Sequence, residues 1–235
     1  MEPPRALIFD VDGTLAETEE LHRRAFNETF TEAGLDWSWD RPLYKELLKT
    51  TGGKERIDTY QRDYLGGSRF LTSNSITTLH KAKTARYIAL MRTDALSLRP
   101  GVDALISEAR EAGLGLAIAT TTSHENIDVL CQCCWSKPPV EVFDVIAAGD
   151  EVKEKKPAPD IFHLVLDQFS LPSSACIAFE DSRNGLLSAN AAGLRTVITP
   201  GMYTEDQNFD DAFTVLPEMP SLKQLTRALQ ISPLG

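Results

Sequence analysis

The sequence predicts an α/β protein: a doubly wound parallel sheet with an α-helical cap domain inserted after the first strand. Three observations lead to this prediction. An apolar run of strand type opens the chain at 6–9, helix-like segments fill the stretch to about residue 96, and beyond it apolar runs alternate with helical segments. Such alternation is typical of βαβ units. We therefore expect a catalytic core formed by residues 1–16 and 97–235 and a helical cap formed by residues 17–96.

The inserted segment is expected to be helical, because its apolar residues recur at helical spacing and no convincing strand pattern interrupts them. In the first predicted helix, 18–33, Leu21, Ala25 and Phe26 fall on one face. The other helices are expected over 44–48, 54–64 and 76–92. Loops are expected at 36–40 and 66–68, where polar residues and glycines interrupt the pattern.

The remainder of the chain is expected to form the rest of the sheet and the helices that cover it. Short apolar runs predict the strands, and segments with helical periodicity predict the helices between them. The expected strands are 114–120, 145–148, 175–179 and 196–199. The expected helices are 102–112, 127–134, 160–169 and 184–192.

Charge and cysteine content limit the class of protein. The 235 residues carry a formal net charge of -10, which argues against a nucleic-acid or anionic-membrane surface. No apolar run approaches the roughly 20 residues of a membrane span, and we expect no signal peptide before the first strand. Three of the four cysteines lie within 131–134 without zinc spacing, so reduced thiols are expected. We expect a monomer, cytoplasmic in a bacterium or stromal in a plastid after loss of a transit peptide.

Two aspartates, Asp10 and Asp12, directly follow the first predicted strand. If the strand continues through Asp12, both carboxylates face one side at its carboxyl end, where open α/β sheets bind ligands. Two adjacent carboxylates repel unless a cation or a shared proton relieves them, so Mg²⁺ is the expected cofactor. The alternative interpretation is a plain Asp-Gly turn in which Asp12 is only a turn residue.

Polar residues also follow the later strands. Thr120 begins a run of four hydroxyl side chains, Lys156 precedes a proline-containing turn, and Glu180 and Asp181 form a second acidic pair. Each alone has a structural explanation, as a helix cap, a solvated lysine or a turn. Together they would meet at one edge of a parallel sheet. Carboxylates for a metal, a hydroxyl donor and a fixed cation predict a phosphoryl-transfer site.

The insert carries a second group of basic residues. A glycine pair at 52–53 precedes Arg56, and Lys81 and Lys83 lie further along. A glycine loop that enters a helix is a favourable place for an anion. An ordinary basic helix surface is the structural alternative, and we prefer it for Lys81. For Arg56 and Lys83 we prefer anion binding, since a guanidinium fork matches phosphate oxygens. Two anion sites imply a substrate with phosphates at both ends, or with one phosphate and an acidic tail.

With these motifs, in this order, the chain resembles the capped phosphatases of the haloacid dehalogenase superfamily over nearly its full length. The resemblance implies a Rossmann-like core and hydrolysis through an aspartyl-phosphate. Asp10 would be the nucleophile and Asp12 the general acid and base, while Thr120 and Lys156 would hold the phosphoryl group. The Mg²⁺ ligands implied are Asp10, the Asp12 backbone carbonyl, Glu180 and Asp181.

Three segments, 12–22, 51–56 and 79–84, are similar to a narrower subfamily, the CbbY-like sugar phosphatases. Members clear xylulose-1,5-bisphosphate, an inhibitor of Rubisco, the carboxylase of the Calvin cycle. The resemblance implies a phosphorylated sugar, expected to be a bisphosphate, as substrate. The substrate-binding residues it implies are Glu17, His22, Gly53, Arg56 and Lys83, together with Thr120 and Lys156.

Other functions remain open at this point. The related β-phosphoglucomutases usually carry an aspartate at the position of Glu17, which favours the phosphatase without excluding the mutase. A phosphoglycolate-type phosphatase is a further alternative. A binding module without activity is the non-enzymatic alternative, and the presence of Asp10, Asp12 and Lys156 argues against it.

Overall fold

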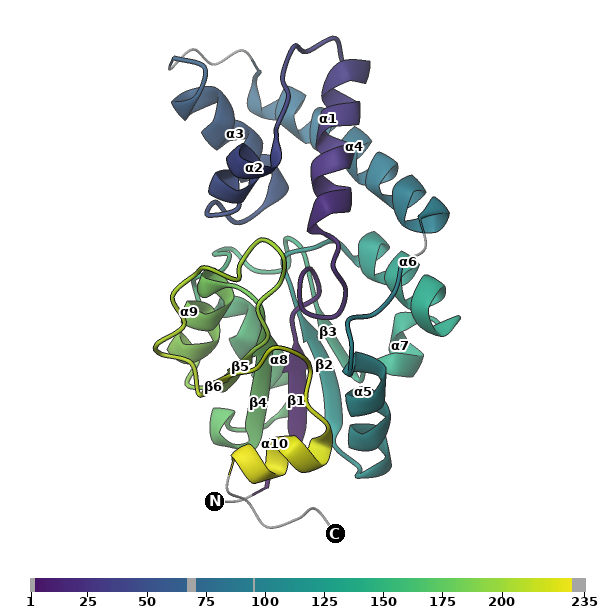
Figure 1. Cartoon of the computed structure of the whole chain (residues 1–235), viewed down its shortest axis with the longest axis vertical. Helices are drawn as coiled ribbons and strands as arrows, with labels where there is room; N and C mark the ends of the chain where they lie inside the picture. Colours follow the sequence, from purple (N-terminus) through teal and green to yellow (C-terminus); the bar gives the residue numbers. More distant parts are fainter. Residues whose placement is uncertain (1–2, 67–70, 95, 230–235) are drawn as a thin grey trace. The chain divides into compact units, whose positions relative to one another are not determined.

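The computed structural model describes residues 3–66, 71–94 and 96–229, and the chain forms two compact units (Figure 1). The first unit comprises Met1–Glu17 and Ser97–Gly235, and the second comprises Thr18–Leu96. Glu17, which we assigned to the insert, belongs to the first unit. The loop expected at 66–68 lies partly outside the described residues.

The first unit is built on a six-stranded parallel sheet in the order β3-β2-β1-β4-β5-β6. This is the strand order of a Rossmann-type fold, with the topological switch point between β1 and β4. The fold class predicted from the sequence is therefore confirmed. The strands are β1 (Ala6–Phe9), β2 (Gly115–Ala119), β3 (Val145–Ala147), β4 (Cys176–Glu180), β5 (Arg195–Ile198) and β6 (Thr214–Val215).

Helices cover both faces of this sheet (Figure 1). They are α5 (Val102–Glu111), α6 (His124–Trp135), α7 (Pro139–Val142), α8 (Asp160–Phe169), α9 (Arg183–Ala191) and α10 (Leu222–Ala228), with a short 3-10 turn at Ser173–Ala175. Helices α8 and α9 cover one face, where Phe162 and Ala189 pack in one apolar cluster with Ile8 and Ala178. Helices α5 and α10 lie on the other face.

The regular elements of the second unit, among its described residues, are all helices joined by loops. Its helices are α1 (Glu19–Glu32), α2 (Arg41–Leu47), α3 (Gly53–Asp63) and α4 (Ser73–Thr93). Aromatic side chains form its centre: the Trp39 ring lies 4.6 Å from Phe26 and 4.8 Å from Phe30, measured between centroids. Of the helices that the structure describes in either unit, none is long and apolar enough to cross a membrane.

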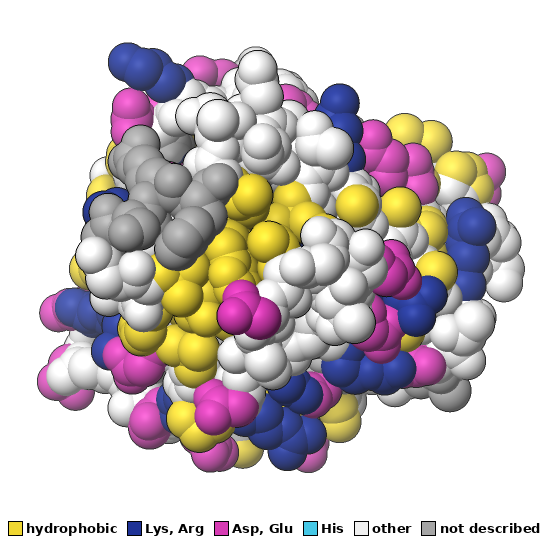
Figure 2. Space-filling model, turned by 90° about the horizontal axis from the view of Figure 1, so that it is seen from above, with side chains coloured by type: hydrophobic (Ala, Val, Ile, Leu, Met, Phe, Trp, Pro, Cys, Tyr) yellow, Lys and Arg dark blue, Asp and Glu magenta, His cyan; other side chains and the backbone are white. Residues whose placement is uncertain are grey.

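The surface of the second unit contains an apolar hollow of about 510 Å³. Figure 2 shows hydrophobic side chains gathered in a hollow of the molecular surface. Leu35, Leu71 and Leu79 contribute to its lining, and Thr29 is among the polar lining residues. The apolar faces of α1 and α4 therefore extend to the surface at this hollow.

The two segments that lead into and out of the insert pair with each other. Ala16 and Leu98 form an antiparallel bridge, and the backbone N–H of Arg99 donates to the carbonyl of Leu15 at 2.8 Å. The outgoing segment belongs to the first unit up to Glu17, and the returning segment belongs to it from Ser97 onward. The chain therefore leaves the sheet unit and returns to it at neighbouring points.

Because the centre of the sheet is buried, we expect a leucine-to-alanine substitution there to lower the stability of the protein far more than the same substitution at the surface. Leu7 in β1 is 0% exposed, whereas Leu187 in α9 is 37% exposed. We expect Leu7→Ala to lower the free energy of unfolding by about 2–5 kcal/mol because it leaves a cavity, and Leu187→Ala by less than about 1 kcal/mol. Urea denaturation of both variants measures the difference, and equal midpoints would contradict the assignment of β1 to the core.

Candidate active site

The chain turns sharply after β1. The strand ends at Phe9, so the condition that it continue through Asp12, on which the alternation argument depended, is not met. Gly13 has a φ of 82°, in the region that favours glycine, and its N–H donates to the carbonyl of Ala16 at 2.8 Å. A tight turn, and not the pleat of the strand, therefore sets the direction of the half-buried Asp12.

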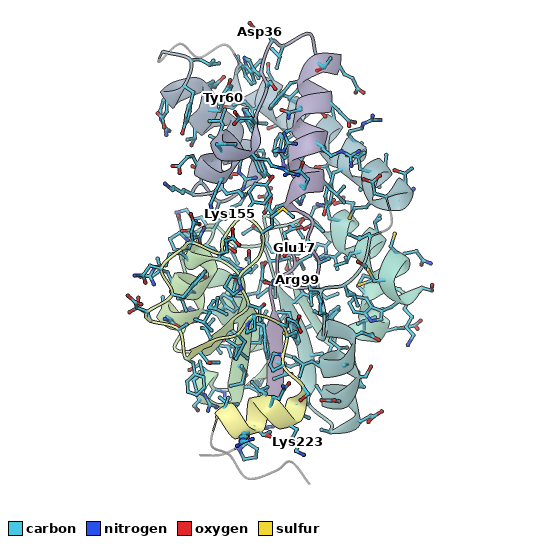
Figure 3. All side chains as sticks on the ribbon, viewed as in Figure 1. Glu17, Asp36, Tyr60, Arg99, Lys155 and Lys223 are labelled. Carbon is cyan, nitrogen blue, oxygen red and sulfur yellow. The ribbon has the colours of Figure 1, made fainter. Side chains whose placement is uncertain are left out.

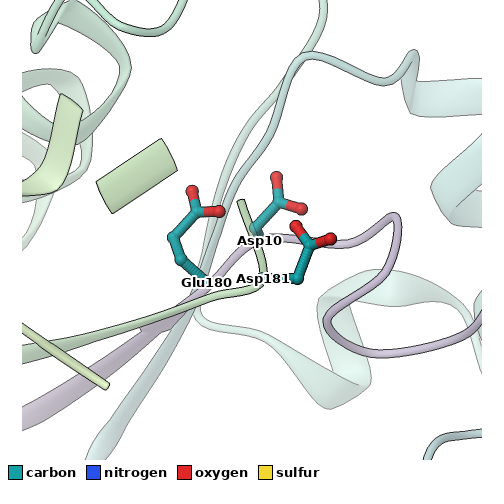
Figure 4. Close-up of side chains that lie close together, drawn as sticks. All are labelled: Asp10, Glu180 and Asp181. Carbon is teal, nitrogen blue, oxygen red and sulfur yellow. The ribbon is translucent and has the colours of Figure 1, made fainter. Parts of the chain in front are cut away.

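Three carboxylates meet at the carboxyl ends of β1 and β4 (Figure 4). Asp10 follows β1, Glu180 is the last residue of β4, and Asp181 comes next. Each offers an oxygen atom within 4.8 Å of the other two, and all three side chains are buried. Because β1 and β4 are neighbours at the topological switch point, the fold itself brings these residues together.

Lys156 lies between two of these carboxylates. Its Nζ donates to Asp10 Oδ1 at 2.7 Å, to Glu180 Oε1 at 2.6 Å and to the carbonyl of Ala119 at 2.8 Å. An ammonium group has three N–H donors, and these contacts occupy all three. The buried lysine is therefore fully satisfied, and its position is determined by β1, β2 and β4 together.

Burial and charge act in opposite directions on the titration of this group. Burial raises the pKa of Glu180 to about 8, against the lowering effect of Lys156, and it also raises the pKa of Asp10. Burial alone would lower the pKa of Lys156, but the charges of Asp10 and Glu180 raise it above its ordinary value. The lysine therefore carries a fixed positive charge, as a phosphoryl-transfer site requires.

The acidic cluster also fits a hard divalent cation. Oxygen atoms of carboxylates are the ligands that Mg²⁺ and Ca²⁺ prefer. Glu180 Oε2 is buried and has no hydrogen-bond partner among the described residues, so one ligand atom is available. Space for the carboxylates is kept by two glycines, since a Cβ at Gly185 would overlap Glu180 and one at Gly13 would overlap Asp181.

Thr120 completes the group at the edge of the sheet. It follows β2, its N–H donates to the carbonyl of Ala147 at 3.0 Å, and it is 1% exposed. A hydrogen bond from its hydroxyl lowers the pKa of Asp10, which places the two side chains in contact. The structure therefore brings together Thr120, Lys156 and the acidic cluster that the sequence had suggested for one site.

In the second unit, Lys83 and His22 contact each other directly. The Lys83 Nζ lies at hydrogen-bonding distance from His22 Nδ1 and above the rings of Phe26 and Tyr87, 4.6 and 5.0 Å from their centroids. The His22 ring stacks on Tyr87 at 3.7 Å. Although α1 and α4 are far apart in sequence, they bring together two of the residues predicted to bind substrate.

Arg56 is tied to its own unit. Its guanidinium donates to Tyr44 Oη at 3.1 Å and to the carbonyls of Leu47 and Thr50 at 3.3 and 3.4 Å. Gly53, the first residue of α3, passes so close to a histidine of α4, His80, that a Cβ atom would overlap its ring. Arg56 therefore has structural partners that helical spacing alone did not reveal.

Sequence reasoning missed two residues of the first unit. Thr204 donates its hydroxyl to Asp181 Oδ2 at 3.1 Å, and Arg99 lies beside Glu17 (Figure 3), with its Nε 3.4 Å from Glu17 Oε1. Glu17 Oε2 also accepts a hydrogen bond from the N–H of Met202 at 3.4 Å. The Leu-Arg-Pro-Gly sequence around residue 99 indicates only a linker, and neither residue belongs to a motif.

Comparisons with known proteins agree with this geometry. Residues 4–193 match the family model of the haloacid dehalogenase-like hydrolases. CbbY of Cereibacter sphaeroides is 53% identical, with 92% of this chain and 93% of that protein covered. CbbY of Rhodobacter capsulatus is 54% identical, with 92% and 93% covered.

A solved structure agrees with this chain over almost the same length. It is a CbbY variant from Rhodobacter sphaeroides in complex with xylulose-1,5-bisphosphate, which is 52% identical and superposes with a TM-score of 0.87 over 92% of this chain and 94% of the other. The chain therefore belongs to the haloacid dehalogenase-like hydrolases and, within them, to the CbbY family.

Proposed function

We propose that this chain is a Mg²⁺-dependent phosphatase that removes one phosphate from xylulose-1,5-bisphosphate. The observation that carries the proposal is the position of Lys156 between Asp10 and Glu180, since a fixed cation beside a carboxylate nucleophile suits the oxygens of a phosphoryl group. The choice of substrate is supported by CbbY of Rhodobacter sphaeroides, 52% identical, which was solved with xylulose-1,5-bisphosphate.

In the first step a carboxylate oxygen of Asp10 attacks phosphorus. The bond between phosphorus and the sugar oxygen breaks, and Asp12 gives its proton to that oxygen, so that the sugar leaves as an alcohol. The products of this step are an aspartyl-phosphate at Asp10 and an ionised Asp12. Thr120 and Lys156 hold the phosphoryl oxygens by hydrogen bonds and charge.

In the second step water attacks the phosphorus atom of the aspartyl-phosphate. The ionised Asp12 takes a proton from the water, inorganic phosphate leaves, and the carboxylate of Asp10 is restored. The two steps replace one difficult displacement by two easier ones. Asp12 regains its proton and the chain returns to its starting state.

The carboxylates of Asp10, Glu180 and Asp181, with the backbone carbonyl of Asp12, would hold the Mg²⁺ ion. When bound, it supplies positive charge that offsets the negative charge of the carboxylates and of the phosphoryl group. The unpartnered Glu180 Oε2 supports this assignment.

The rest of the substrate is assigned to residues of the helical unit and to Glu17. His22, Arg56 and Lys83 offer N–H donors and positive charge for a second phosphate. Gly53 is assigned to the same group, and the His80 ring occupies the place where its side chain would lie. Glu17 offers a carboxylate to a sugar hydroxyl. A bisphosphate uses all of these groups, whereas a monophosphate offers the basic ones no second phosphate to bind.

A substrate panel tests the proposed function. Phosphate release with Mg²⁺ is measured on xylulose-1,5-bisphosphate, ribulose-1,5-bisphosphate, phosphoglycolate and β-glucose-1-phosphate. We expect a strong preference for the first, and Asp10→Asn is expected to lower its rate at least about 10³-fold because the nucleophile is lost. Conversion of β-glucose-1-phosphate to an isomer, without phosphate release, would identify a mutase instead.

The raised pKa of Glu180 predicts pH-dependent metal binding. With a pKa of about 8 in the metal-free protein, Glu180 is mostly protonated at neutral pH and must lose that proton to bind a cation. The apparent affinity for Mg²⁺ should therefore rise with pH up to about 8, by at most about tenfold per pH unit. Calorimetry in buffers of different ionisation enthalpy measures the proton released.

The Glu180→Gln variant is the control for this measurement, because it should release no proton from this position on binding Mg²⁺. An affinity that stays constant between about pH 6.5 and pH 8 would show that Glu180 is already ionised in the metal-free protein.

The role of Lys83 in substrate binding can be distinguished from the effect of an ordinary surface lysine on the same helix. Lys83 is 4% exposed, whereas Lys81 lies exposed on the same helix. We expect Lys83→Met to raise KM for xylulose-1,5-bisphosphate about tenfold or more, because a charge-assisted hydrogen bond to phosphate is lost. Lys81→Met should leave KM unchanged. Steady-state kinetics on both variants provides the comparison, and equal KM values would remove Lys83 from the binding site.

A further inference from the structure

Arg99 contacts several parts of the first unit at once, although it lies in the segment that returns from the insert. Its Nη1 donates to the carbonyls of Gly13 and Thr199, the latter at 2.7 Å, and its Nη2 donates to the carbonyl of Pro200 at 2.7 Å. The Nε lies 3.4 Å from Glu17 Oε1, and the side chain is only 10% exposed. A planar guanidinium distributes its five donors over three nitrogen atoms and so reaches these four separate acceptors, whereas a lysine ammonium has three donors on a single atom.

The contact with Gly13 bears on Asp12. The Gly13 carbonyl belongs to the peptide unit between Gly13 and Thr14, one unit beyond the one that follows Asp12, inside the turn closed by the hydrogen bond from Gly13 to Ala16. A guanidinium bound to that carbonyl determines the orientation of the peptide plane. Arg99 therefore holds the turn from which the proposed general acid projects.

The contacts with Thr199 and Pro200 link this turn to a second loop of the site. That loop follows β5 and continues to Thr204, which donates to Asp181 Oδ2 at 3.1 Å. The N–H of Gly201 donates to the Thr204 hydroxyl at 2.8 Å. One side chain thus joins the turn after β1 to the loop that contacts the acidic cluster.

The contact with Glu17 concerns the substrate. One carboxylate oxygen faces Arg99 Nε, and the other accepts from the N–H of Met202 in the loop after β5. The Glu17 side chain is nevertheless 39% exposed, so Arg99 and the N–H of Met202 orient its carboxylate without burying it. A carboxylate held in this way loses less conformational entropy when it binds a sugar hydroxyl.

We propose that Arg99 is a positioning residue for the reaction. Its guanidinium fixes the positions of the Asp12–Gly13 turn and of the Glu17 carboxylate relative to the loop after β5. It touches neither the reacting atoms nor the acidic cluster. This inference rests on the proposed function, because it assigns Arg99 a role in the protonation of the leaving group and in the selection of the sugar.

The test compares two leaving groups in the full chain with Mg²⁺. The sugar oxygen of xylulose-1,5-bisphosphate leaves only when Asp12 protonates it, whereas nitrophenolate leaves from p-nitrophenyl phosphate without a proton. For each substrate kcat/KM reports the steps up to departure of the leaving group. We expect Arg99→Lys to lower kcat/KM about 10- to 100-fold for the sugar phosphate and no more than about threefold for p-nitrophenyl phosphate.

Arg110→Lys is the matched control. Arg110 also pairs with a carboxylate, Asp144, and with a backbone carbonyl, that of Val142, but it has no contact with the turn or with Glu17. We expect this variant to keep the kcat/KM of the wild type on both substrates. The double variant Glu17→Gln/Arg99→Lys is also measured on the sugar phosphate. Its loss of kcat/KM should be smaller than the product of the fold losses of the two single variants, since the two residues act through one contact.

The outcomes are distinct. An equal loss on both substrates makes Arg99 a structural residue only and overturns the inference. Failure of the wild type to hydrolyse either substrate overturns the proposed function itself. Arg99→Gln serves as a second variant, and circular dichroism checks the fold of each. If neither variant folds, Arg99 is a folding residue and the proposed role in positioning is wrong.

Discussion

The contact of the Lys156 ammonium with two buried carboxylates is the interaction on which the rest of this site depends. Removing a lysine or a carboxylate from water is costly, and each charge is tolerated only because its partner and a complete set of hydrogen bonds are in place. Lys156 bonds to Asp10, to Glu180 and to the carbonyl of Ala119. The register of the sheet supplies all three, since β2, β1 and β4 are consecutive in it.

The balance of charge explains how a strongly acidic chain can act on an anion. The formal net charge is -10, and at the site the carboxylates of Asp10, Glu180 and Asp181 face a single lysine. A divalent cation held among these carboxylates cancels the local excess of negative charge. The electrostatic field of the whole acidic surface then affects anion binding less than the few charges inside the buried site do, because buried charges are weakly screened.

The sequence predicts the framework of this protein well, because continuous apolar runs and helical periodicity are local signals. The helix at Asp160–Phe169 has the predicted bounds. Of the two possibilities left open after the first strand, continuation through Asp12 and a turn at Asp-Gly, the structure has the turn, because Gly13 adopts a left-handed conformation. A lone Asp-Gly pair did not distinguish these two possibilities.

The contacts of the basic residues are the part of the structure that the sequence predicts least well. Arg99 bonds to backbone carbonyls 86 and 101 residues away along the chain, and every residue has such a carbonyl, so no sequence pattern marks the partner. The same holds for Arg56, whose side chain bonds to two carbonyls within its own unit and to the Tyr44 hydroxyl. Residue type predicts what a side chain can do, and only the fold determines which partners it finds.

The bridge between Ala16 and Leu98 allows the inserted helices and the sheet unit to change independently in evolution. Since the chain leaves and re-enters the sheet unit at adjacent points, lengthening, shortening or replacing the helices between them places no demand on strand register. The residues proposed to cleave the bond all lie in the sheet unit and can be kept constant while the inserted helices diverge. The insert is thus an exchangeable module, and a protein engineer could graft a helical unit from another member of the family at these two positions without redesigning the catalytic carboxylates.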